Sequence, residues 1–394
     1  MEHKRGGTHM IRACAALMMR PHPYKNEDAA RILGFDGRPH GLIVIANGAT
    51  AGGRGAKIIS TALVEKACYY ANFILEEEIS SFKDESDWDF LLDSIARMAC
   101  IHAICRTRGW IRERMREVTR SVVSELVPES LIHQPLPPPP QHDVETARRK
   151  PHREGVQEET REEGVAPGTE EDEIKKLERS FSEFYAKEPD FRRLVMEEIS
   201  NIYEVYRVHL INEATENLIK KLPERFEQID PSKVYAGVST LLIMISHTCI
   251  QGNEEVVRVC FRGAGNSSIL IKTYTGEPEY WTTGSEEEKD MITTHMTRGA
   301  QIRRAFSFRE TTILSDLPAI VISATDGACL GEEDYRKSLL EKINILLDDV
   351  KRGLLVNTED VRRVLESVLK GYLDTIQTDD DATIAAAVFW RSIA

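Results

Sequence analysis

Three short motifs between residues 21 and 53 decide how this chain folds: Asn26-Glu27-Asp28-Ala29, the apolar run Leu42-Ile43-Val44-Ile45-Ala46, and Asn47-Gly48-Ala49-Thr50-Ala51-Gly52-Gly53. A carboxylate pair, a buried strand and a glycine-rich turn that leads into a helix are typical of a site for metal and phosphate. Asn47 stands where such a site needs a carboxylate that bridges metals, and its side chain is a neutral amide. This residue therefore separates a working enzyme from one that has lost its chemistry.

The composition limits the classes of partner. The chain has 394 residues, of which 41% are hydrophobic, so it can bury a sizeable core. Its formal net charge of −13 argues against binding to a nucleic-acid backbone and favours a basic partner. The seven cysteines show no C-x-x-C spacing, which is typical of reduced thiols in the cytosol. No apolar run approaches the roughly 20 residues of a membrane helix, so we expect a cytoplasmic protein.

The pattern of apolar residues predicts strands near both ends of the chain and helices between them. Strands are expected within residues 10–46, and helices from residue 52 onward and from about 88 to 126. The second half predicts strands at 238–245, 256–261, 268–272, 313–314, 319–324 and 382–390, and helices at 332–351 and 358–373, the last of them capped by Asn357 or Thr358. This order indicates an α+β layered domain.

The middle of the chain differs in composition. Residues 131–170 contain a proline run at 135–140 and then a stretch rich in Glu, Arg and Gly, which predicts a disordered linker. The proline run is a spacer or a ligand for an aromatic groove. Residues 171–230 return to a helical pattern. We therefore expect residues 1–130 and 231–394 to form one domain that carries a linker and a helical insertion.

Acidic residues stand at the ends of several predicted strands. Asp326 follows the strand at 319–324, Asp380 and Asp381 precede the last strand, and Glu27 and Asp28 lie in the first strand region. Carboxylates that project from strand ends into one cleft are ligands for Mg²⁺ and Mn²⁺. Two such ions about 4 Å apart can activate a water molecule that attacks a phosphate ester.

Six short elements in this chain follow one order: Asn26-Glu27-Asp28-Ala29, Ile45-Ala46-Asn47-Gly48, Gly237-Val238-Ser239-Thr240-Leu241, Gly265-Asn266-Ser267-Ser268-Ile269-Leu270, Ser323-Ala324-Thr325-Asp326-Gly327 and Asp380-Asp381-Ala382-Thr383. In this order the chain resembles the PPM family, the metal-dependent protein serine/threonine phosphatases of type 2C. The resemblance implies a four-layer α/β/β/α sandwich of two antiparallel sheets flanked by helices. It also implies Mn or Mg bound by Asp326, Asp380, Glu27, Asp28, Asn47 and Gly48, and a phosphoprotein substrate.

The chain departs from the family pattern at four positions. Asn47 replaces the bridging Asp, Asn266 replaces another Asp, no His follows Gly48, and Pro23 stands in place of the phosphate-binding Arg. Arg20 and Lys25 are the nearby candidates for phosphate binding, although both are out of register. The resemblance therefore implies one metal ion or none rather than a tightly bridged pair.

Two functions follow from these departures. One is a pseudophosphatase, a binding or regulatory module that holds a protein partner or a phosphoprotein. The alternative is an active Mn- or Mg-dependent protein serine/threonine phosphatase with an altered metal site. An N-terminal-nucleophile hydrolase, another four-layer sandwich, needs a freed Thr, Ser or Cys at its start, and no such processing site is marked. The oligomeric state is not indicated by the sequence.

Overall fold

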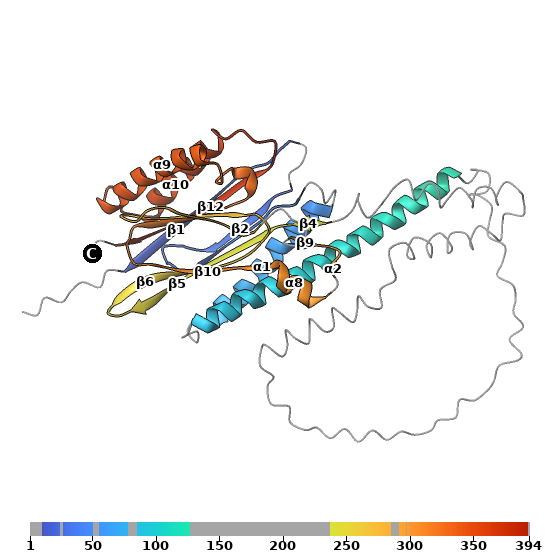
Figure 1. The fold of residues 1–394 in the computed structure, drawn as a ribbon, viewed down its shortest axis with the longest axis horizontal. Helices are drawn as coiled ribbons and strands as arrows, with labels where there is room; N and C mark the ends of the chain where they lie inside the picture. Colours follow the sequence, from blue (N-terminus) through green and yellow to red (C-terminus); the bar gives the residue numbers. More distant parts are fainter. Residues whose placement is uncertain are drawn as a thin grey trace, which may run out of the picture. The chain divides into compact units, whose positions relative to one another are not determined.

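A computed structural model describes residues 10–23, 27–49, 55–77, 85–126, 237–284, 291–296 and 298–392. Two five-stranded antiparallel sheets lie at its centre (Figure 1). The first has the order β1 (Ile11–Arg20), β12 (Ala382–Arg391), β11 (Ala319–Ala324), β7 (Ser268–Thr273) and β8 (Glu279–Thr282). The second has the order β10 (Phe308–Leu314), β6 (Glu254–Ala264), β5 (Leu241–Gln251), β3 (Gly41–Ala46) and β2 (Ala29–Gly34). A short pair joins β4 (Val238–Ser239) to β9 (Ile292–Thr293).

Helices flank the two sheets. Helices α9 (Glu333–Lys351) and α10 (Thr358–Leu373) cover the first sheet, and α1 (Ala56–Glu77) contacts β2, β3 and β5 of the second sheet. Helix α2 (Glu85–Leu126) contacts β6 of the second sheet through ion pairs to Arg262, and α8 (Gly299–Ala305) precedes β10. The predicted α+β sandwich of two antiparallel sheets with flanking helices is confirmed.

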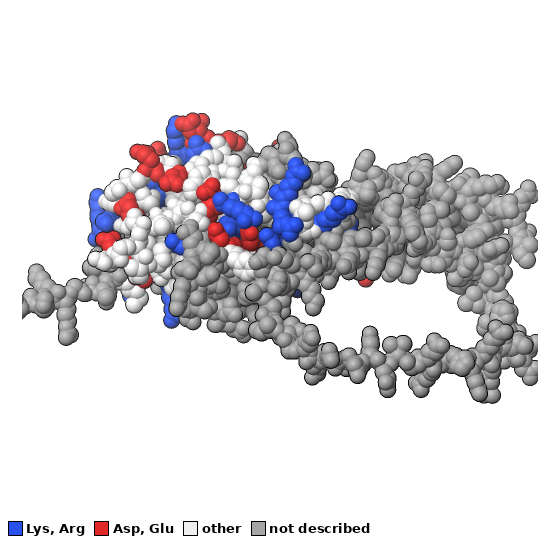
Figure 2. Space-filling model, turned by 60° about the horizontal axis from the view of Figure 1, so that its bottom comes forward, with Lys and Arg blue, Asp and Glu red and all other residues white. Residues whose placement is uncertain are grey.

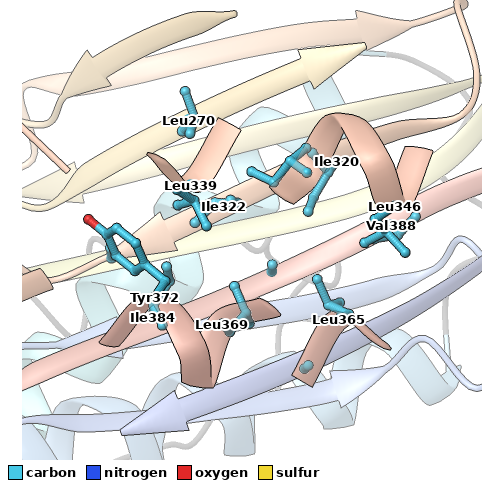
Figure 3. Close-up of a cluster of buried hydrophobic side chains, with 14 of the residues drawn as sticks. Leu270, Ile320, Ile322, Leu339, Leu346, Leu365, Leu369, Tyr372, Ile384 and Val388 are labelled. Atoms are coloured by element: carbon cyan, nitrogen blue, oxygen red, sulfur yellow. The ribbon is translucent and has the colours of Figure 1, made fainter. Parts of the chain in front are cut away.

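Apolar side chains fill the space between these layers. Strands β3, β11 and β12 are buried along almost their whole length because both faces of their sheets are covered. Helix α10 turns Val361, Leu365, Leu369 and Tyr372 to the same side, at the spacing of an amphipathic helix. Figure 3 shows how leucines of α9 and α10 face the first sheet, where the labelled partners are Leu270, Ile320, Ile322, Ile384 and Val388.

Several predicted elements match the structure closely. The helix predicted at 358–373 has those bounds, and Asn357 caps it by accepting a hydrogen bond of 2.8 Å from the backbone N–H of Asp360. The strand predicted at 313–314 is longer, Phe308–Leu314, and β8 was not predicted. The predicted linker at 131–170 and the helical insertion at 171–230 lie outside the described residues.

Contacts group the described residues up to Glu113 and from Gly237 onward into one compact unit, and α2 from Arg114 belongs to another. In the described ranges no helix is both long and apolar enough to span a membrane. On the face of the molecule shown in Figure 2, Lys and Arg side chains lie among Asp and Glu side chains. The charge of a candidate site must therefore be judged from the residues that form it.

Candidate functional site

The candidate site lies where β3 and β11 end and β12 begins. Strands β11 and β12 are antiparallel neighbours, so Ala324 pairs with Ile384, and the loops that carry Asp326 and Asp380 meet. Gly327 lies between these loops, and a Cβ at this position would collide with the backbone oxygen of Asp381 and lie 3.4 Å from the Cβ of Asp380. Glycine is needed here because the two loops pack backbone against backbone.

Two asparagines hold the carboxylate of Asp326. The Nδ2 of Asn47 donates to Oδ1 of Asp326 at 2.5 Å, and the Nδ2 of Asn266 donates to Oδ2 at 3.0 Å. The backbone N–H of Gly327 also donates to Oδ1, at 3.0 Å. Two of the four positions at which the chain departs from the PPM pattern, Asn47 and Asn266, thus contact one acidic side chain. We call this arrangement the amide clamp on Asp326.

The main chain of Asn47 is fixed from its other side. Its N–H donates to Oγ1 of Thr240 at 3.1 Å, and its carbonyl accepts from the N–H of Thr240 at 2.8 Å and from the hydroxyl of Ser239 at 2.9 Å. The side chain is 5% exposed, and its Oδ1 has no hydrogen-bond partner in the described part of the chain. Because the main chain of Asn47 is fixed in this way, its amide can release Asp326 only by a rotation of the side chain, and not by a shift of the loop.

Asp28 has the opposite environment. It is 1% exposed, its Oδ2 accepts from the hydroxyl of Thr325 at 2.9 Å, and its Oδ1 has no partner among the residues that the structure describes. Burial raises the pKa of Asp28 to about 7, the hydroxyl groups of Thr383 and Thr325 oppose this, and the nearby charges of Asp381 and Asp326 add to it. Near neutral pH the carboxyl group of Asp28 is therefore partly protonated.

Asp381 anchors the segment before β2. Its Oδ1 accepts from the backbone N–H of His22 at 2.5 Å, and its Oδ2 accepts from the backbone N–H groups of Glu27 and, at 3.3 Å, of Asp28. This buried carboxylate therefore accepts hydrogen bonds from backbone N–H groups that are not satisfied by strand pairing. The sequence drew attention to Asp380 and treated Asp381 only as its neighbour, so this anchoring residue was missed.

Asp380, Glu27 and Gly48 complete the cluster. The carboxylate of Asp380, which is half-buried, accepts from the backbone N–H of Asp381 at 2.9 Å. The carbonyl of Glu27 accepts from the N–H of Gly48 at 3.3 Å and from the hydroxyl of Ser60 at 2.5 Å. A Cβ at Gly48 would lie 2.8 Å from the backbone of Ala56, which explains the glycine.

The cations near the cluster differ from those expected. One guanidinium nitrogen of Arg20 donates to the carbonyls of Leu373 at 2.5 Å and Ile376 at 2.9 Å, so this side chain holds the C-terminal end of α10. Lys25 lies outside the described residues. Lys57, in the first turn of α1, donates to the carbonyl of Asp28 at 2.5 Å and was missed by the sequence analysis. Phosphate binding by Arg20 or Lys25 stays a prediction.

The residues do not fit a bridged pair of divalent ions. In the described ranges, no three His, Cys, Asp or Glu side chains are placed to hold a metal ion together. The hydrogen bonds of Asp326 explain why a bridged pair does not fit. Amide N–H groups donate to both of its oxygens, and a cation would have to displace them. The metal-ligand roles of Asp326, Asp380, Glu27, Asp28, Asn47 and Gly48 stay predictions.

A cleft of about 640 Å³ opens beside the cluster. One wall is Arg20, Pro21, His22 and Pro23, and the other is Ile376, Gln377, Thr378 and Asp379. Asp381, two residues after Asp379, holds the backbone of His22 and so links the two walls from the buried side. The cleft and the acidic cluster are therefore neighbours.

No family model matches the chain, and no curated protein matches it. Among solved structures, it is similar to RsbX in complex with magnesium, at 11% identity, with 98% of this chain and 97% of that chain covered and a TM-score of 0.36. It is also similar to the catalytic domain of the serine/threonine protein phosphatase PstP with two manganese ions, at 11% identity, 97% and 100% coverage and a TM-score of 0.36. A third is a serine/threonine phosphatase 2C from Toxoplasma gondii, at 11% identity, 95% and 94% coverage and a TM-score of 0.32.

Proposed function

We propose that this chain is a PPM-type phosphatase-like protein that has lost two-metal chemistry and acts as a binding or regulatory module. The observation that carries this proposal is the amide clamp, in which Asn47 and Asn266 donate to the two oxygens of Asp326 at 2.5 and 3.0 Å. A bridging ligand must offer negative charge and lone pairs to both ions, whereas these amides offer neutral N–H donors.

The cost of converting the clamp into a metal site supports the same proposal. Turning the Asn47 amide would bring its oxygen against the Asp326 carboxylate and break the hydrogen bond between them. Losing a buried hydrogen bond to a charged group costs about 1–3 kcal/mol. A metal ion would have to offset this free-energy cost at Asn47 and again at Asn266. Even then, neither amide would supply the negative charge of a bridging ligand.

The proposed partner is a protein, in keeping with the phosphoprotein or protein partner expected from the sequence. The cleft between residues 20–23 and 376–379 is large enough for a few side chains of such a partner. In this proposal the fold presents that cleft, and the adjoining acidic cluster holds one wall of it in place through the hydrogen bond from the N–H of His22 to Asp381.

Turnover assays test the proposal. Purified full-length protein is assayed with p-nitrophenyl phosphate and with phosphoserine and phosphothreonine peptides, each with MnCl₂, MgCl₂ or EDTA. We expect wild-type rates at the background level under all conditions. Asn47→Asp and the double variant Asn47→Asp/Asn266→Asp are measured in parallel, and Asp326→Ala is the control for a contaminating phosphatase. Metal-dependent turnover by the wild type that disappears in Asp326→Ala would refute the proposal.

The alternative is an active phosphatase with an altered metal site, and one observation favours it. The Oδ1 atoms of Asp28 and Asn47 are buried acceptors with no hydrogen-bond donor in the described residues. Each of these oxygens is an acceptor that a cation could use. The same assays decide between the two functions, since this alternative requires wild-type activity with Mn or Mg.

A further inference from the structure

The core between the two sheets becomes polar at the end near the amide clamp. In the first sheet, Val321 of β11 and Ala385 of β12 belong to the apolar cluster to which both sheets contribute. Side chains two positions apart on a strand point to the same face of its sheet. Ser323 and Thr383 therefore face the second sheet, and each is 0% exposed. Hydroxyl groups thus take the place of apolar groups where β11 ends and β12 begins.

The second sheet contributes a carboxyl group and an amide to the same space. Ile45 of β3 belongs to the apolar cluster, and Ala30 of β2 packs against it. Asn47 and Asp28 lie two positions from these residues, so their side chains point toward the first sheet. The pairing of β2 with β3 continues past the strand ends and places these two side chains next to each other. The polar groups of the two sheets therefore face one another.

Contacts between the sheets bring these groups together. The hydroxyl of Thr325 donates to Oδ2 of Asp28 at 2.9 Å, and the N–H of Thr383 donates to Oγ1 of Thr325 at 3.0 Å. The hydroxyl of Thr383 lies close enough to the carboxyl group of Asp28 to oppose the rise in its pKa. Ser323 precedes Thr325 by two positions and so lies on the same face. The side chains of the two sheets therefore meet around Asp28.

Four oxygen atoms in this region have no hydrogen-bond partner in the part of the chain that the structure describes. They are Oδ1 of Asp28, Oδ1 of Asn47, Oγ of Ser323 and Oγ1 of Thr383. Their residues are at most 5% exposed, so these atoms are shielded from bulk water. Buried polar atoms in folded proteins are paired with protein groups or with ordered water in the great majority of cases. Four such atoms on facing strands indicate a bound ligand.

The chemistry of the four atoms selects the ligand. Oδ1 of Asn47 and an ionised Asp28 accept hydrogen bonds, whereas the hydroxyl groups of Ser323 and Thr383 can donate. One water molecule donates twice and accepts twice, so it can satisfy all four atoms. A cation would bind the oxygens but leave two hydroxyl protons without an acceptor. The side chains here are also small, since Ser323 is paired with Ala385, and they fill less space than the leucines and isoleucines of the apolar end.

We infer that one internal water molecule is bound between the two sheets, with hydrogen bonds to Asp28, Asn47, Ser323 and Thr383. It joins β2 and β3 to β11 and β12. By donating to Oδ1 of Asn47 it also holds this amide in the orientation in which Nδ2 donates to Asp326. The inference concerns the core of the fold, and it holds whether the chain is a binding module or an active phosphatase.

Oxygen-17 magnetic relaxation dispersion tests this inference, because it counts the water molecules that stay bound for longer than the protein takes to rotate. The full-length wild type is compared with Ser323→Val, whose larger apolar side chain occupies the space of the water. Thr383→Val exchanges a hydroxyl for a methyl group of similar size. Thr107→Val is the matched control, because Thr107 is also 0% exposed but its hydroxyl donates to the carbonyl of Ala103 at 2.8 Å.

We expect Ser323→Val to lose one long-lived water molecule relative to the wild type. Thr383→Val should exchange this water about fivefold faster, since one of its four hydrogen bonds is lost, and Thr107→Val should match the wild type. An unchanged water count in Ser323→Val, or an equal loss in Thr107→Val, would overturn the inference. Where Ser323→Val does not fold, Thr383→Val decides alone, and wild-type exchange in that variant would contradict the bound water.

Thermal unfolding of the wild type in equal concentrations of NaCl, KCl and choline chloride separates water from a monovalent cation. A bound water predicts the same melting temperature in all three salts. A melting temperature that rises by a few degrees in NaCl or KCl alone would assign the site to that cation and overturn the inference.

Discussion

Asp326 and Asp28 lie in one cluster but have opposite environments. Three donors converge on Asp326, two of them from asparagine side chains, whereas Asp28 is buried and accepts a hydrogen bond from the hydroxyl of Thr325. The chain thus surrounds Asp326 with neutral donors, whereas burial raises the pKa of Asp28.

Loss of the contact between the loop of Asp326 and the loop of Asp380 should have the largest effect on stability, because this contact positions both of these acids. In Gly327→Ala the new Cβ would collide with the backbone oxygen of Asp381, so the loops must separate. We expect the free energy of unfolding, measured by urea denaturation, to fall by about 3 kcal/mol or more. Gly109→Ala in α2 is the control, because nothing lies within 4 Å of a Cβ there, and it should be neutral or slightly stabilising. Similar stabilities for the two variants would contradict the described packing.

Asn47→Asp should turn the neutral clamp into a pair of like charges. The hydrogen bond of 2.5 Å to Asp326 would be replaced by repulsion between two carboxylates. We expect a loss of about 2–3 kcal/mol in EDTA, and partial recovery of the melting temperature in millimolar MnCl₂. Asn47→Ala separates the two effects, since it removes the hydrogen bond without adding charge and should not respond to Mn²⁺. A wild-type-like stability of Asn47→Asp in EDTA would argue against the clamp.

Protonation of Asp28 should make the stability depend on pH. Its pKa in the folded protein is raised from 3.8 to about 7, so the folded state holds a proton that the unfolded state releases. The stabilising contribution is complete below pH 3.8 and is lost as pH rises to about 7, above which it stays lost. Asp28→Asn removes this titration, so its stability relative to the wild type should improve by about 3 kcal/mol between pH 4.5 and pH 8. Chemical denaturation at both pH values measures the difference, and parallel pH profiles would contradict the raised pKa.

His247, a buried group outside the cluster, should change the pH dependence of stability by a smaller amount and in the opposite direction. His247 of β5 stacks on Trp88 of α2, with ring centroids 3.9 Å apart and an interplanar angle of 9°. Burial lowers the pKa of His247 from 6.5 to about 4, so its stabilising contribution is present above pH 6.5 and is lost as pH falls through 4. His247→Gln should reduce the loss of stability between pH 6.5 and pH 4.5 by about 2 kcal/mol, as measured by tryptophan fluorescence during urea unfolding. No change in this interval would show that His247 is not held neutral by burial.

The sequence predicted the elements whose pattern is local. Helix α10 was predicted with its observed bounds because Val361, Leu365 and Leu369 recur every four residues and Asn357 provides a cap. Strands β3, β11 and β12 were predicted because they are continuous apolar runs. Strand β8 has the mixed sequence Glu-Tyr-Trp-Thr at a sheet edge, where exposure removes the apolar pattern.

The candidate site was predicted in part. Asp28, Asn47, Asp326 and Asp380 were named from strand ends, and the structure brings them into one cluster. The sequence could not show that Asn266 and Asn47 contact the same carboxylate, because 219 positions separate them and their meeting depends on the pairing of distant strands. It likewise could not show that Asp381 holds backbone N–H groups more than 350 positions away.

Calorimetric titration of Mn²⁺ tests the central claim most directly, because it measures whether the amide clamp on Asp326 excludes a bridged pair of ions. Wild-type protein and Asn47→Asp/Asn266→Asp are titrated at the same pH after treatment with EDTA and buffer exchange. We predict that the wild type does not bind two ions, and that the double variant gains affinity by at least about tenfold. Tight binding of two Mn²⁺ ions by the wild type, unchanged in the double variant, would contradict the account.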